Sequence, residues 1–130
     1  MNIKQFNDWL SSDNKQSLIM GILNVTPDSF SDGGQYFDKN VAVEHALAMI
    51  RNGANIIDIG GESTRPFSDP VSLDEEISRV IPVIKGIRKK SDVCISIDTT
   101  KSMVASEALN VGASITVSYT HLTLPTNDLV

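Results

Sequence analysis

Three groups of polar residues in this 130-residue chain each follow a short apolar run. They are Asn24–Gly34, Gly60–Pro66 and Asp98–Lys101. Apolar runs of this length are typical of buried strands, and the carboxyl ends of parallel strands are where such sheets bind small molecules. The three groups are therefore the candidates for a substrate site.

Asp98 says more about the chemistry of a site than any other residue of the three groups. Its carboxylate belongs to a buried strand, where a charge is costly unless something pairs with it. Lys101 could be that partner, and so could a ligand that carries N–H donors.

Each of the other residues, taken singly, is explained at least as well by a role in local structure as by a role in binding or catalysis. Asn24 and the following Thr26–Asp28 could form a turn, and Thr99 or Thr100 could cap a helix.

The elements that position these groups alternate between strand and helix. Strands are predicted at 18–24, 54–60 and 93–98, helices at about 40–52, 72–90 and 101–110, and a fourth strand from 113. Gly53 and Gly112 are stop signals for two of the helices. Pro82 is expected to kink or unwind the second helix locally, and Arg88–Lys90 to be its solvated end. This alternation predicts βαβ units and a parallel sheet.

Two architectures fit this alternation, an open doubly wound sheet and a closed (β/α)8 TIM barrel. The third strand separates bulky residues from small and polar ones: Val93, Ile95 and Ile97 share one face, and Cys94, Ser96 and Asp98 share the other. Small and polar residues suit a barrel interior near its mouth, so we favour the barrel. A barrel needs roughly 250 residues, so we expect only the first three βα units and the start of the fourth strand.

Composition narrows the class of protein further. The net charge of −5 argues against a nucleic-acid partner, and no apolar run is long enough to span a membrane. The polar stretch 1–16 is unlike a signal peptide, so a cytoplasmic location is expected. Cys94 is the only cysteine, which excludes a disulfide within the chain, and we expect it to be a buried strand residue.

Two long motifs and one strand resemble those of dihydropteroate synthases. Met20–Gly34 resembles the first signature of that family, Ile57–Pro66 the second, and Ile95–Thr99 its third strand. The resemblance implies a transferase of folate biosynthesis with a TIM barrel and Mg²⁺. The reaction it implies condenses 6-hydroxymethyl-7,8-dihydropterin pyrophosphate with p-aminobenzoate to give 7,8-dihydropteroate and pyrophosphate. It also implies a homodimer.

The resemblance assigns a role to each matching residue. Asn24 and Asp32 match metal-binding positions, and Asp98 matches an aspartate of the pterin pocket. The second loop matches a substrate-binding segment next to p-aminobenzoate: Thr64, Arg65 and Pro66. Phe30, Asp32 and Arg65 match positions at the catalytic centre.

The resemblance ends near Ile115. The domain prediction is therefore a pterin-binding part at 1–115 and a non-family tail at 116–130, which could be adapter or frameshifted sequence. Val117 stands where the family has an asparagine of the pterin pocket, and we expect the isolated chain to be inactive. Two alternatives remain: another pterin-binding barrel of the methyltetrahydrofolate methyltransferase type, or a non-catalytic pterin-binding module.

Overall fold

A computed structural model describes residues 1–26, 38–62 and 70–117 of the chain. The elements in chain order are α1 (Ile3–Ser11), β1 (Met20–Asn24), α3 (Lys39–Arg51), β2 (Ile56–Gly60), α4 (Leu73–Arg88), β3 (Cys94–Asp98), α5 (Ser102–Asn110) and β4 (Ile115–Val117). The predicted strands and helices are all present, with ends that differ from the predicted ones by one or two residues.

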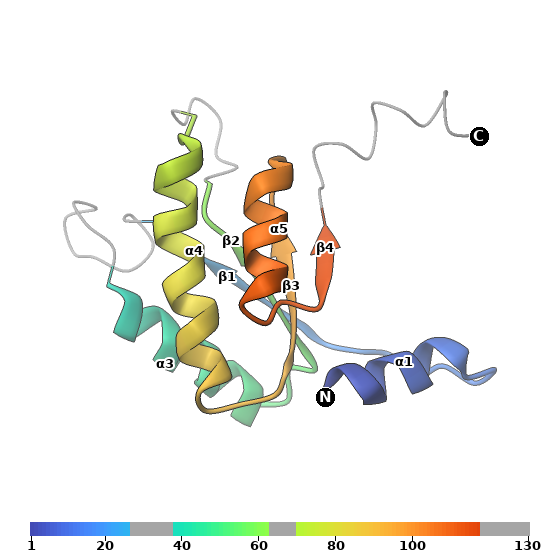
Figure 1. Cartoon of the computed structure of the whole chain (residues 1–130). Helices are drawn as coiled ribbons and strands as arrows, with labels where there is room; N and C mark the ends of the chain where they lie inside the picture. The colour runs from blue at the N-terminus through green and yellow to red at the C-terminus, as the bar shows by residue number, and fades with distance from the viewer. Residues whose placement is uncertain (27–37, 63–69, 118–130) are drawn as a thin grey trace, which may run out of the picture.

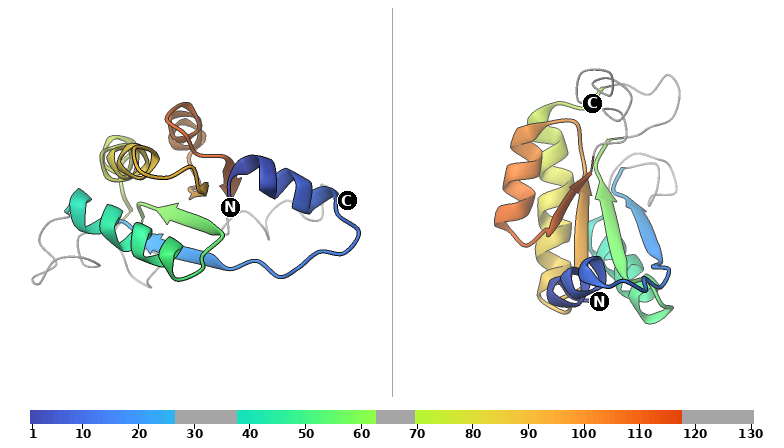
Figure 2. Two further views of the ribbon diagram at one scale, coloured as in Figure 1. Left: turned by 90° about the horizontal axis from the view of Figure 1, so that it is seen from below. Right: turned by 90° about the vertical axis from the view of Figure 1, so that its right-hand side faces the viewer.

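The four strands form one parallel sheet in the order β1-β2-β3-β4. Helices α3, α4 and α5 all cover the same face of this sheet (Figures 1 and 2). A doubly wound sheet would reverse its strand order and carry helices on both faces. The consecutive order is that of neighbouring βα units in a (β/α)8 barrel, so the predicted fold class is confirmed.

The two faces of the sheet differ in chemistry because successive side chains of a strand alternate. The helix-covered face holds a set of apolar side chains that are at most 1% exposed: Leu23, Ile57, Ile59, Ile95 and Ile97. The opposite face carries Asp58, Ser96 and Asp98. This division is the one predicted for the third strand, and the structure extends it to β2.

The helix ends follow the expected signals. Ser72 caps α4, with its hydroxyl accepting a hydrogen bond from the Glu75 N–H at 3.2 Å. Gly53 and Gly112 follow α3 and α5 with φ angles of 111° and 124°, which favour glycine. Of the two effects expected of Pro82, a kink or local unwinding, the unwinding is absent, because the helix runs without a break from 73 to 88. Buried residues on both sides of Pro82, among them Val80 and Val83, pack into the same core and hold the two halves together.

The solvated end predicted for α4 was also wrong at Arg88, although Lys89 and Lys90 are exposed. The Arg88 guanidinium donates hydrogen bonds to the carbonyls of Gly112 at 2.9 Å and Val93 at 2.5 Å. Burial lowers the pKa of Arg88 from its ordinary value. Arg88 therefore ties together α4, the start of β3 and the turn after α5.

Helix α1 lies beside the amino ends of the strands (Figure 1). Asn2 caps it by accepting from the Gln5 N–H, and the Trp9 indole donates to the Gln16 carbonyl at 2.6 Å. The Met1 carbonyl accepts from the Cys94 N–H at 2.7 Å, which joins this segment to the buried β3. Among the described residues, no helix is long and apolar enough to cross a membrane.

Replacement of Gly86 tests how closely α3 and α4 pack. A Cβ atom at Gly86 would lie 2.7 Å from Val43 Cγ2, and valine in a helix has little freedom to turn away. We expect Gly86→Ala to lower the free energy of unfolding by about 1–3 kcal/mol through overpacking. The measurement is urea denaturation.

The matched control is the same substitution in a Val43→Ala background. There the clash is gone, and Gly86→Ala should instead stabilise by up to about 1 kcal/mol through helix propensity. Equal effects in the two backgrounds would contradict this account of the contact.

Candidate functional site

The carboxyl ends of the strands bring the candidate residues into one row. The register pairs Asn24 with Gly60, Gly60 with Asp98, and Asp98 with Val117, so these residues share a face of the sheet. This is the face away from the helices. The structure describes two of the predicted site residues, Asn24 and Asp98. They therefore lie on the same side of the sheet, with β2 between their strands.

Gly60 puts no side chain between Asn24 and Asp98 in this row. A Cβ atom added to Gly60 would lie 3.7 Å from Asp98 Oδ2, so the carboxylate leans over the glycine. Two strand spacings put Asn24 and Asp98 about 10 Å apart along the row. A flat ligand could approach the backbone at Gly60, with the Asp98 carboxylate as acceptor for its N–H groups.

A second row lies one layer deeper and contains a carboxylate that the sequence analysis did not single out. Asp58 is 2% exposed and Ser96 is fully buried, and the Ser96 hydroxyl donates to Asp58 Oδ1 at 2.5 Å. Burial raises the pKa of Asp58, and the hydrogen bond from Ser96 opposes part of that rise. Asp58, like Asp98, is a carboxylate on the inner face of a buried strand, and this signal is present in the sequence.

A buried carboxylate on α4 binds the residues that follow β3. Glu76 is fully buried, and its Oε2 accepts from the Thr99 hydroxyl at 2.6 Å while its Oε1 accepts from Lys101 Nζ at 2.8 Å. Lys101 Nζ also lies 3.6 Å from Glu62 Oε2. These contacts raise the pKa of Lys101, first through its hydrogen bond with Glu76.

This arrangement bears on two expectations from the sequence. Of the two partners weighed for Asp98, Lys101 forms ion pairs with Glu76 and Glu62. Thr99 is not the cap of α5, because Lys101 occupies the N-cap position. The Thr99 hydroxyl instead accepts the Lys101 N–H at 3.1 Å while it donates to Glu76.

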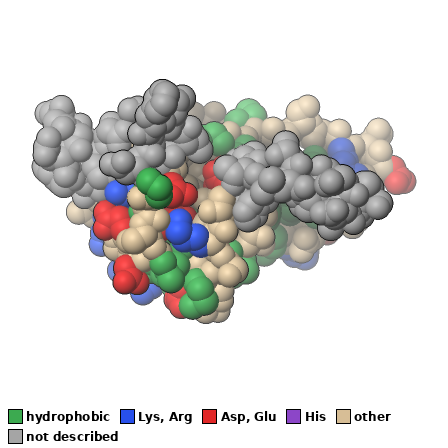
Figure 3. Space-filling model, turned by 90° about the horizontal axis from the view of Figure 1, so that it is seen from above, with side chains coloured by type: hydrophobic (Ala, Val, Ile, Leu, Met, Phe, Trp, Pro, Cys, Tyr) green, Lys and Arg blue, Asp and Glu red, His purple; other side chains and the backbone are tan. Residues whose placement is uncertain are grey.

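Helix α4 holds one described flank of the segment that follows β2, and Glu62 joins the two described flanks to each other. Arg79 Nη1 donates to the Gly61 carbonyl at 2.9 Å, and Glu62 Oε2 accepts from the Val71 N–H at 3.0 Å. A Cβ atom at Gly61 would lie 2.9 Å from Val80 Cγ1, so only glycine lets the chain approach the helix here. In the view onto the carboxyl ends, acidic and basic side chains lie next to one another (Figure 3).

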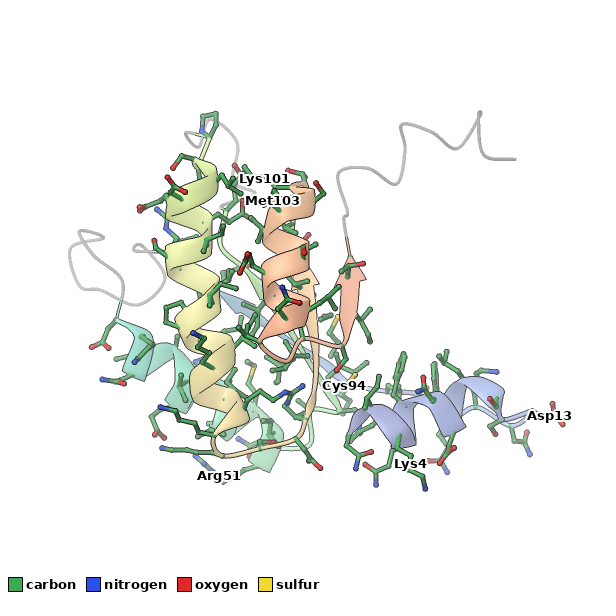
Figure 4. The ribbon with its side chains drawn as sticks, in the orientation of Figure 1. Lys4, Asp13, Arg51, Cys94, Lys101 and Met103 are labelled. Atoms are coloured by element: carbon green, nitrogen blue, oxygen red, sulfur yellow. The ribbon has the colours of Figure 1, made fainter. Side chains whose placement is uncertain are left out.

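The polar groups are separated from Cys94 by the length of the sheet. Lys101 lies where the upper ends of α4 and α5 meet, and Cys94 lies toward the opposite end (Figure 4). Cys94 is buried, as predicted, and burial raises the pKa of its thiol. A protonated, inaccessible thiol has no part in the site chemistry.

The other predicted site residues lie outside the described part of the chain: Phe30, Asp32, Thr64, Arg65 and Pro66. Within residues 1–26, 38–62 and 70–117, no group of three or more His, Cys, Asp or Glu side chains is placed to hold a metal ion.

Comparison with known proteins points to one family. The family described as "Pterin binding enzyme" matches residues 20–124. The dihydropteroate synthase of Bacillus subtilis is 62% identical over 101 residues, which are 78% of this chain and 35% of that protein.

The solved structures that resemble this chain are also dihydropteroate synthases. A Xanthomonas albilineans dihydropteroate synthase with 4-aminobenzoic acid superposes with a TM-score of 0.76 and 44% identity, covering 85% of this chain and 40% of that one. A Yersinia pestis dihydropteroate synthase in a sulfonamide drug complex superposes with a TM-score of 0.74 and 46% identity. Again 85% of this chain and 40% of that chain are covered. The chain thus spans well under half the length of the relatives it matches.

Asp58→Asn tests the electrostatics of the deeper row. A group whose pKa is raised by folding contributes stability below its unfolded pKa, and that stability is lost as the pH rises through the folded value. We therefore expect the free energy of unfolding of Asp58→Asn to increase relative to that of the wild type as the pH rises from about 4 towards 7. Urea denaturation across this range measures the difference.

The control is Ser96→Ala in the same assay. This change removes the hydrogen bond that favours the ionised Asp58, so it should destabilise the protein more at pH 7 than near pH 4. A difference between Asp58→Asn and the wild type that does not change with pH would contradict the assignment.

Proposed function

Because the chain belongs to the pterin binding enzyme family, we propose that the protein carrying it is a dihydropteroate synthase of folate biosynthesis. It would condense 6-hydroxymethyl-7,8-dihydropterin pyrophosphate with p-aminobenzoate and release pyrophosphate. The observation that carries this proposal is the row Asn24–Gly60–Asp98, which unites three motif residues on one face at the carboxyl ends of the strands. The named relatives and their ligands support the same activity.

Asp98 binds the pterin in this proposal. Its carboxylate accepts hydrogen bonds from the N–H groups along the aminopyrimidinone edge of the ring. Gly60 lets the ring approach the strands closely, since no side chain stands between Asn24 and Asp98. The Asp58–Ser96 pair forms the polar layer beneath this position.

The donor set at the end of β1 fits Mg²⁺. Asn24 is exposed there and offers an amide oxygen, and Mg²⁺ is often held by one or two protein oxygens together with substrate phosphates. Asn24 and Asp32 would hold the ion. When bound, it would stabilise the negative charge of the departing pyrophosphate.

The two loops would supply the rest of the reacting centre. Phe30 and Asp32 belong to the first motif and would close over the pterin methylene group, where they would exclude water. Thr64, Arg65 and Pro66 belong to the second loop and form the p-aminobenzoate site. The arylamine nitrogen displaces pyrophosphate directly, so no covalent enzyme intermediate is needed.

The proposal extends to setting and assembly. We place the enzyme in the cytoplasm, as a homodimer that acts on small molecules. Sulfonamides should compete with p-aminobenzoate, in line with the complex of the Yersinia pestis relative.

The test of the function is condensation by the purified protein that carries this chain, with Mg²⁺ and both substrates. Asp98→Asn should weaken pterin binding about 10- to 100-fold, because it removes a charged hydrogen-bond acceptor. Pyrophosphate release and calorimetric titration measure turnover and binding. Pterin binding without turnover would favour a non-catalytic module, and methyl transfer from methyltetrahydrofolate would favour the other type of barrel.

Val117→Asn tests the fourth position of the row. Val117 is in register with Asp98, and the family resemblance implies an amide there. We expect the substitution to tighten pterin binding about tenfold by adding hydrogen bonds. Thr116→Asn is the matched control, since Thr116 is in register with Ile97 on the other face and should leave binding unchanged.

A further inference from the structure

The buried carboxylate of Glu76 joins two segments that are far apart in the sequence. We propose that Glu76 is a positioning residue, which acts through Thr99, Lys101 and Glu62 to set the pterin-binding and arylamine-binding segments relative to each other. This inference rests on the proposed function. We call these four residues the Glu76 clamp.

Burial of the Glu76 carboxylate costs free energy that its partners must offset. A fully buried charge is tolerated only when it is paired and hydrogen-bonded. Each of its oxygens has one partner, the Thr99 hydroxyl at 2.6 Å and Lys101 Nζ at 2.8 Å. Both contacts are short, and the Glu76 carboxylate itself is buried, so displacement of either partner would leave a poorly compensated charge.

The clamp residues are close in sequence to the residues proposed to bind the substrates. Thr99 directly follows Asp98, so its bond to Glu76 fixes the end of β3 from which the Asp98 side chain projects. Glu62 lies two residues before Thr64, and its carboxylate holds both Lys101 Nζ and the Val71 N–H. Thus Lys101 connects the segment after β3 to both ends of the segment after β2.

Arg88 forms a polar tie at the other end of β3 that can be compared with the clamp. Among the described residues, Arg88 donates its hydrogen bonds to backbone carbonyls alone, and it lies at the amino end of β3, away from the site row. The Glu76 clamp lies at the carboxyl ends, and side chains next to both substrate positions form it. A tie that served stability alone would not need to join these two segments.

The experiment uses three substitutions in the protein that carries this chain, each with steady-state kinetics for both substrates. Thr99→Val replaces the hydroxyl with a methyl group and should raise the KM for the pterin substrate. Glu62→Gln should raise the KM for the arylamine. Glu76→Gln should raise both, and each rise should be about tenfold or more, because small misplacements of binding groups are costly.

Two controls separate positioning from loss of folding. Thr99→Ser keeps the hydroxyl and should restore the pterin KM. Glu44→Gln removes the same charge as Glu76→Gln from an exposed ion pair with Lys90, 3.4 Å long, and should leave both KM values unchanged. A loss that falls equally on both substrates in all three variants, or that Thr99→Ser does not reverse, would overturn the proposal.

A second readout keeps the clamp testable if the wild type shows no condensation. That result would defeat the proposed function alone. The clamp is then judged by hydrogen exchange of the Val71 and Lys101 amides, which donate to Glu62 and Thr99. Glu76→Gln should accelerate both relative to core strand amides, and unchanged exchange at both would overturn the clamp.

Discussion

The alternation of side chains along parallel strands is the constraint on which the rest of this structure depends. Because the register is fixed, every second residue of β1, β2 and β3 must face the helices, and those positions hold leucine, isoleucine and, at Gly21, a glycine that lies close to Met49. The intervening positions are thereby available for chemistry. A slip of one residue in β2 would bury Asp58 among apolar side chains, and the same slip in β3 would bury Asp98, at a cost that the fold could not meet.

Much of the fold could be predicted from the sequence because its signals are local and periodic. The apolar runs, the Ser72 cap and the stops at Gly53 and Gly112 each depend on a few neighbouring residues. The solvated Arg88 and the unwinding at Pro82 were wrong predictions for the opposite reason. The guanidinium of Arg88 finds carbonyls on β3 and after α5, and Pro82 is held by packing on both sides, so neither outcome is visible from adjacent sequence.

The site was predicted in part. Asn24 and Asp98 lie where strand ends must lie, and alternation alone puts them on one face. The clamp was not foreseen, because Glu76 stands among three acidic residues in the first turn of α4, where a helix dipole explains all of them equally. Only the three-dimensional structure shows that this one is fully buried and that it takes Lys101 as its partner.

The attachment of the segment after β2 to α4 has a consequence for protein engineering. Gly61 fits against Val80, its carbonyl is held by Arg79, and Glu62 shares Lys101 with Glu76. A chimera that imports this loop from a relative would therefore inherit ends shaped for a different helix. The natural unit of exchange is the loop together with the first half of α4 and residues 99–101, and substitutions in these three pieces should be accepted or rejected as a set.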